Sequence, residues 1–242
     1  MKNNITVAHR GAFKKNGLPE NSIASLQEAI RIGCKGSEFD VWMTADSVLV
    51  VHHDPVIEKV SIEKLTYQEL SQFSLSNGEK LPLLEEYLRA GAHQDITLVC
   101  EIKPSEISKE RSLVVAEKVV EVVKKLKVEK LIYISFDYDI LKKILKIDNG
   151  AQTQYLQGEK SPLEVKKDGI TGVDYHYSVF QKHPQWIAEA KQNHIKLNAW
   201  TVNDEKDMDW LITQGLTSKL TSLWPRLLRA LSLLSTLKPT TP

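Results

Sequence analysis

The chain has 242 residues, of which 42% are hydrophobic and 26% charged, and its formal net charge at pH 7 is +1. These values are those of an ordinary globular protein, and the small net charge gives no broad electrostatic reason to bind nucleic acid or an anionic membrane. No apolar run is long enough to span a bilayer, and no signal-peptide pattern is found. We therefore expect a cytoplasmic protein as the chain stands, or a periplasmic or secreted one if a leader has been removed.

Short strand-like runs alternate with amphipathic helical patterns. The predicted strands are, in chain order, Ile5–Ala8, Ser37–Met43, Ile96–Ile102, Leu131–Ser135, Gln152–Leu156, Gly172–Tyr175 and Ile195–Thr201. The predicted helices are Ser22–Ile32, Ser112–Leu126, Asp139–Lys146, Leu163–Lys167, Pro184–Gln192 and Asp204–Gln214. Such alternation predicts a parallel sheet with crossover helices, and an eighth strand would close a (β/α)8 TIM barrel. An open doubly wound sheet is the alternative, although no glycine-rich nucleotide fingerprint follows a strand.

Residues 44–83 interrupt this alternation. They read as a turn, a strand over Val48–His52, a short helix near Tyr67–Ser71 and a loop before a helix that starts at Leu83. This pattern predicts a small insertion after the second barrel strand.

The C-terminal tail, residues 216–242, also departs from the pattern. After Asp209 the chain has no acidic residue, and polar residues over Leu216–Leu223 predict an eighth strand that is atypical, poorly formed or missing. Such a defect would leave exposed edges on the first and seventh strands. An amphipathic helix is expected over Pro225–Leu237, and a changed reading frame or a diverged terminus would explain the tail. We expect one barrel domain over residues 1–242.

Carboxylates lie on two neighbouring predicted strands. Glu38 and Asp40 lie two apart in "GSEFDVWMTAD", so they share one face of the strand. Burying both costs free energy unless a cation lies between them, and a divalent metal ion is the natural candidate; a solvent-facing strand end is the alternative. Glu101 and Lys103 end the next apolar strand. Because strand ends converge at one rim of a barrel, Glu101 is a candidate third ligand and Lys103 a candidate contact for an anion, unless the two form only a local ion pair.

Histidines follow two strands at the same predicted rim. His9 ends the first strand, and His52 and His53 occur in "LVVHHDP". Neighbouring residues of a strand point to opposite faces, so only one of the last two is expected at the site. A single histidine is more often a packing or surface residue, but the coincidence with the carboxylates favours a functional cluster.

Several short segments then occur in a characteristic order over about residues 5–215. They are AHRG, LPENS, GSEFDVWMTAD, VVHHDP, LPLLEEYL, EIK and AWTVND. This series resembles the glycerophosphodiester phosphodiesterase family. The resemblance implies a barrel that hydrolyses glycerophosphodiesters to sn-glycerol 3-phosphate and an alcohol, with Mg²⁺ or Ca²⁺ as cofactor and without nucleic acid or stable membrane insertion.

The resemblance also implies residue roles. General acid–base catalysis falls to His9 and His53, and His53 is preferred over His52 because the family pattern has a histidine directly before the aspartate. The remaining roles are metal ligation by Glu38, Asp40 and Glu101, phosphate binding by Arg10 and Lys103, metal or glycerol binding by Glu20, and lining of the glycerol side by Trp200. Two alternatives stay open: a phospholipase C- or D-like enzyme acting on lysophospholipids, and a catalytically impaired barrel that binds phosphate esters.

Overall fold

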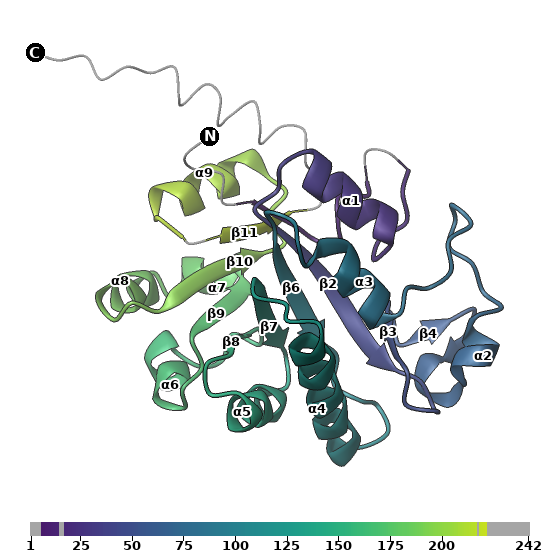
Figure 1. The fold of residues 1–242 in the computed structure, drawn as a ribbon. Helices are drawn as coiled ribbons and strands as arrows, with labels where there is room; N and C mark the ends of the chain where they lie inside the picture. The colour runs from purple at the N-terminus through teal and green to yellow at the C-terminus, as the bar shows by residue number, and fades with distance from the viewer. Residues whose placement is uncertain (1–5, 15–16, 217, 222–242) are drawn as a thin grey trace, which may run out of the picture.

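The protein is described by a computed structural model covering residues 6–14, 17–216 and 218–221 (Figure 1). Within these ranges, eight parallel strands form the wall of a barrel. In order around the wall they are β1 (Thr6–Ala8), β2 (Gly36–Met43), β6 (Thr97–Ile102), β7 (Leu131–Ser135), β8 (Gln152–Tyr155), β9 (Gly172–His176), β10 (Lys196–Trp200) and β11 (Ser218–Thr221). Because β1 pairs with both β2 and β11, the ring is closed. The (β/α)8 barrel is confirmed, and the open sheet is excluded.

Helices cover the outside of this wall (Figure 1). They are α1 (Ile23–Arg31), α3 (Leu84–Gly91), α4 (Lys109–Lys125), α5 (Tyr138–Ile147), α6 (Pro162–Lys167), α7 (Tyr177–Lys182), α8 (Gln185–Gln192) and α9 (Glu205–Thr213). Alternate residues of β2 pack outward on them; the Phe39 ring lies 4.5 Å from that of Tyr87 on α3. Helix α4 begins about one turn earlier than its predicted start at Ser112. The reason is that Ser108 caps the helix, because its side chain accepts a hydrogen bond from the Arg111 amide.

The insertion after β2 is also confirmed. It contains β3 (Leu49–Val51), which pairs antiparallel to β2, the hairpin of β4 (Val56–Ile57) and β5 (Val60–Ser61), the 3₁₀ turn η1 (Ile62–Lys64) and the short helix α2 (Tyr67–Leu70). A separate small core of Trp42, Val50, Ile62, Leu70 and Leu81 holds it together. In Figure 1 these elements extend beyond the end of β2, on the side of the barrel that carries α3 and α4.

The expectation of a missing eighth strand is wrong. Strand β11 pairs in parallel with β1, where Val7 faces Leu220, and with β10, where Asn198 faces Ser218. The carbonyl oxygen of Thr221 then accepts a 3.1 Å hydrogen bond from the His9 amide. Strands on both sides supply main-chain partners, so pairing here does not depend on an apolar sequence, and neither β1 nor β10 is left with an open edge.

The helix expected over Pro225–Leu237 lies outside the described residues. Among the helices that the structure does describe, none has the length and apolar character needed to cross a membrane.

Candidate active site

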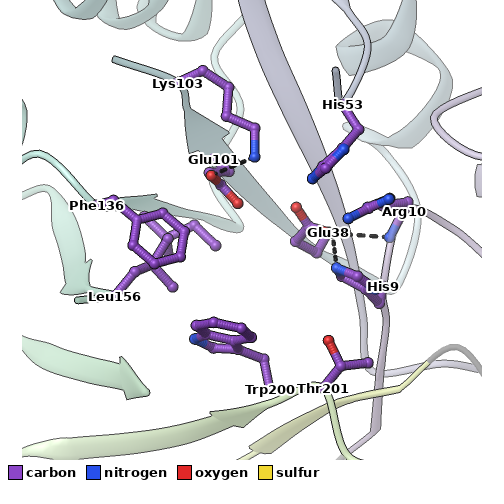
Figure 2. Close-up of a pocket in the computed structure, with 11 residues that line it drawn as sticks. His9, Arg10, Glu38, His53, Glu101, Lys103, Phe136, Leu156, Trp200 and Thr201 are labelled. Carbon is purple, nitrogen blue, oxygen red and sulfur yellow. Dashed lines mark hydrogen bonds and ion pairs between the residues drawn. The ribbon is translucent and has the colours of Figure 1, made fainter. Parts of the chain in front are cut away.

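A pocket opens at the carboxyl ends of the barrel strands (Figure 2). Seven of the residues predicted for the site line it: His9, Arg10, Glu38, His53, Glu101, Lys103 and Trp200. Four further residues line it that were not predicted: Ile134, Phe136, Leu156 and Thr201. Asp40 is buried beside them and is bonded to the Lys103 ammonium.

Three buried carboxylates form the centre of the site. Each of Glu38, Asp40 and Glu101 contributes an oxygen, and these oxygens lie within 4.8 Å of one another. The cluster arises because β2 and β6 are neighbours in register, with Asp40 facing Glu101. One oxygen of Glu38, Oε1, is buried and has no hydrogen-bond partner among the described residues. Three hard oxygen donors, one of them unsatisfied, fit a divalent cation such as Mg²⁺ or Ca²⁺.

Crowding and burial act on the pKa of each carboxyl. Burial, and then the Asp40 charge, raise the pKa of Glu38 well above its usual value. The same two causes raise the pKa of Glu101 to about 7. Burial also acts to raise the pKa of Asp40, but the Lys103 ammonium and His53 outweigh it and hold this pKa below its usual value. The site therefore concentrates negative charge that a cation would neutralise.

Lys103 is held between two of these carboxylates. Its Nζ lies 2.8 Å from Asp40 Oδ1 and 2.6 Å from Glu101 Oε1. The Glu101–Lys103 ion pair considered from the sequence therefore exists, but Asp40 is part of it. Burial acts to lower the pKa of Lys103, yet Asp40 and Glu101 outweigh it and raise the pKa, so the side chain stays charged.

A tight turn after β1 directs Arg10 into the site. Arg10 and Gly11 have φ values of 55° and 78°. A Cβ on residue 11 would lie 2.3 Å from Ser25 Oγ, so only glycine fits this approach to α1. The turn points the Arg10 amide at Glu38 Oε2, at 2.8 Å.

The guanidinium of Arg10 then spans two acids. Its Nη1 donates to Glu20 Oε1 at 3.0 Å, and its Nε lies 3.8 Å from Asp40 Oδ2. Glu20 is not among the lining residues, so among the described residues its link to the pocket runs through Arg10.

The two candidate histidines approach from different elements. His9 Nε2 lies 4.0 Å from Glu38 Oε2. Burial lowers the pKa of His9 to about 3, and the Arg10 charge acts in the same direction, so the ring is uncharged near neutral pH. His53 Nδ1 lies 2.7 Å from Asp54 Oδ1.

The neighbouring His52 lies elsewhere. Its Nδ1 is 2.9 Å from the Asp54 carbonyl oxygen, and it does not line the pocket. The Trp42 indole donates to the His53 carbonyl oxygen at 3.1 Å, and this bond fixes the backbone at His53. Only one histidine of the pair lines the pocket, as expected, but β3 ends at Val51, so strand alternation is not the reason.

Sequence reasoning missed Asn21 as a site residue, because Asn21 lies directly before the helix predicted over Ser22–Ile32. Its side chain donates to Asp40 Oδ2 at 2.8 Å and accepts from the Asp40 amide at 3.2 Å. The sequence analysis also left out Phe136, whose ring meets that of the predicted Trp200 edge to face at 5.6 Å, while the Trp200 indole donates to the Asp174 carbonyl oxygen. The available signal was position in the chain: Phe136 directly follows a predicted strand, and Leu156 and Thr201 are the last residues of two others.

Comparison with known proteins agrees with this geometry. The model of the glycerophosphoryl diester phosphodiesterase family matches residues 9–221. A glycerophosphodiester phosphodiesterase of Caldanaerobacter subterraneus subsp. tengcongensis is 25% identical, with 90% of this chain and 93% of that protein aligned.

Solved structures are similar as well. A glycerophosphodiester phosphodiesterase from Parabacteroides distasonis is 42% identical, has a TM-score of 0.92 and is matched over 96% of this chain and 98% of its own. A phosphodiesterase from Oleispira antarctica, solved in complex with its product sn-glycerol-3-phosphate, is 25% identical, with a TM-score of 0.80 and coverage of 94% and 96%. With the barrel and the carboxylate-lined pocket, these matches show that the chain belongs to the glycerophosphoryl diester phosphodiesterase family and is an enzyme of that family.

Proposed function

We propose that this pocket hydrolyses glycerophosphodiesters to sn-glycerol 3-phosphate and an alcohol, with a divalent cation and a pair of histidines. The proposal is carried by one observation: three buried carboxylates, the positively charged side chains of Arg10 and Lys103, and two histidines lie together at one rim. The product complex of the Oleispira antarctica relative supports the choice of product.

Glu38, Asp40 and Glu101 are the residues that would hold the cation. Bound there, Mg²⁺ or Ca²⁺ would supply Lewis-acid stabilisation of the charge that develops on the phosphoryl oxygens. The unsatisfied Glu38 Oε1 supports this assignment, because a buried acceptor without a partner costs free energy unless something binds it.

Arg10 and Lys103 would bind the phosphate. A phosphodiester is anionic and repels an approaching nucleophile, so fixed positive charges lower that repulsion and favour the transition state. Both side chains are largely buried and already held by carboxylates, which keeps them in place before substrate arrives. Glu20 would act on the glycerol side or on the cation, and Trp200 would line the glycerol.

His9 and His53 would move the protons. One ring removes the proton of the attacking hydroxyl as the new P–O bond forms, and the other gives a proton to the alcohol oxygen as the old P–O bond breaks. The Asp54 carboxylate occupies Nδ1 of His53, so proton transfer by this ring falls to Nε2. The attacking hydroxyl is either the glycerol 2-hydroxyl, which gives a cyclic phosphate that water opens, or water itself.

An assay on glycerophosphocholine tests the proposal. Purified protein is given Mg²⁺ or Ca²⁺, and release of sn-glycerol 3-phosphate is measured with and without a chelator. We expect release that the chelator abolishes and that added metal restores. Binding without release would instead support the impaired barrel, and turnover of lysophosphatidylcholine alone would support the phospholipase-like alternative.

A further inference from the structure

A buried glutamate in the insertion contacts the loop that follows Lys103. Glu63 lies on η1 and is 2% exposed. Its carboxylate accepts hydrogen bonds from Ser105 Oγ at 2.6 Å and from the Glu106 amide at 2.8 Å. Ser105 is two residues beyond Lys103, so Glu63 fixes the course of the chain immediately after the lysine at the pocket.

Arg111 completes this contact from the first turn of α4. Its Nε donates to Glu63 Oε1 at 2.9 Å. Its Nη2 donates to the carbonyl oxygens of Met43 at 3.1 Å and Thr44 at 2.6 Å, at the end of β2. One guanidinium therefore joins the insertion, α4 and the strand that carries two of the three carboxylates.

The same 3₁₀ turn also contacts the segment that carries His53. The Ile62 amide donates to the Pro55 carbonyl oxygen at 2.9 Å, two residues after His53. Turn η1 thus lies between the His53 segment and the Lys103 loop and is bonded to both. Neither Glu63 nor Arg111 lines the pocket, so any effect on the reaction must act through these two segments.

A role in stability alone would not require a buried ion pair between Glu63 and Arg111. Burying an ion pair costs desolvation energy, and an apolar pair of similar size is often as stable. What an apolar pair lacks is the directed set of five hydrogen bonds that fixes three segments relative to one another. We propose that Glu63 and Arg111 are positioning residues that set the spacing between His53 and Lys103 in the proposed phosphodiesterase site.

Two variants test this role, which rests on the proposed function. Glu63→Leu/Arg111→Met removes the ion pair, and Arg111→Lys keeps the charge but cannot reach Glu63 and both carbonyl oxygens together. Activity is measured well below each melting temperature and expressed per folded molecule. We expect kcat/KM to fall about 100-fold in the double variant and about 10-fold in Arg111→Lys, because small displacements of reacting groups are costly. Wild-type kcat/KM in folded Arg111→Lys would overturn the proposal, even if the double variant fails to fold.

A matched control and a second readout complete the design. Glu85→Leu/Arg89→Met removes an exposed ion pair on α3 and should leave kcat/KM unchanged. Calorimetric affinity for inorganic phosphate reports on Lys103 without turnover, and we expect it to weaken about 10-fold in Arg111→Lys. If the wild type releases no sn-glycerol 3-phosphate, the proposed function fails, while weaker phosphate binding in the variant still supports the positioning role and unchanged binding overturns it.

Discussion

The two sides of the pocket are built from different halves of the barrel (Figure 2). The charged side comes from β2, from the ends of β1 and β6 and from the segment after β3, and it carries His9, Arg10, Glu38, His53 and the Glu101–Lys103 pair. The apolar side comes from β7, β8 and β10 and carries Phe136, Leu156 and Trp200. Every titratable group that lines the pocket within the described residues lies on the first side.

The charged side carries the groups proposed for catalysis, whereas the apolar side sets the shape of the pocket. The charged side is held by ion pairs and by a strained turn, with Arg10 at a φ of 55°. The apolar side joins a small cluster of Val7, Val99, Ile134 and Leu156 inside the barrel. An apolar wall strengthens the electrostatic interactions opposite it, because it keeps the local dielectric low. Changes on the charged side should therefore reduce kcat, whereas changes on the apolar side should act on substrate binding.

The largest effect is expected at the carboxylate cluster. Glu38→Gln keeps the size of the side chain but removes one charge from the proposed metal site, so kcat/KM should fall at least about 10³-fold, the equivalent of several kcal/mol of metal stabilisation. Calorimetric titration with Mg²⁺ and Ca²⁺ should show weaker binding in parallel. Glu121→Gln, on the exposed face of α4, serves as the control. Normal metal affinity in Glu38→Gln would contradict the ligand assignment.

The next largest effect on activity is expected at the two histidines of the pocket. His9→Ala and His53→Ala should each lower kcat about 10²- to 10⁴-fold while the circular dichroism spectrum stays that of the wild type. His52→Ala is a close control, because this ring is adjacent in sequence but does not line the pocket. If His52→Ala were the inactive variant, the assignment of the pair would be reversed.

A glycine substitution tests the strained turn on the charged side. Gly11→Ala places a Cβ against Ser25 at a φ of 78°, so unfolding in urea should show a loss of about 2–4 kcal/mol. Gly17 also has a positive φ, of 65°, but within the described part of the chain no atom lies within 4 Å of the added Cβ. Gly17→Ala should therefore cost only about 1 kcal/mol. Equal losses in the two variants would show that close packing on α1 does not determine the turn.

The charged side was more predictable from the sequence than the apolar side. Glu38, Asp40 and Glu101 could be placed together because side-chain alternation and the convergence of parallel strand ends are local and regular rules. Phe136 and Leu156 also lie at strand ends, but apolar residues are common there in any core, so their position alone does not mark them as pocket residues. The bonds of Glu63 to Ser105 and Arg111 join distant segments, which no local pattern encodes.

At the eighth strand, the local sequence pattern led to a wrong expectation. Its polar residues argue against a strand when local composition alone is considered. In the barrel, β1 and β10 offer main-chain partners on both sides, and β11 pairs with both. Tertiary context therefore overrides local preference at this position.

The smallest effect, and the sharpest contrast with the charged side, is expected at Trp200. Trp200→Ala removes the ring that meets Phe136 and the indole bond to the Asp174 carbonyl oxygen. Because this ring would contact ground state and transition state alike, KM should rise about 10-fold with little change in kcat. Steady-state kinetics on glycerophosphocholine measures both constants, and Trp186→Ala, which alters a ring stacked on His183 and absent from the pocket lining, provides the control. A kcat loss as large as that of His9→Ala would mean that the apolar side takes part in the chemistry and that the division between the two sides does not hold.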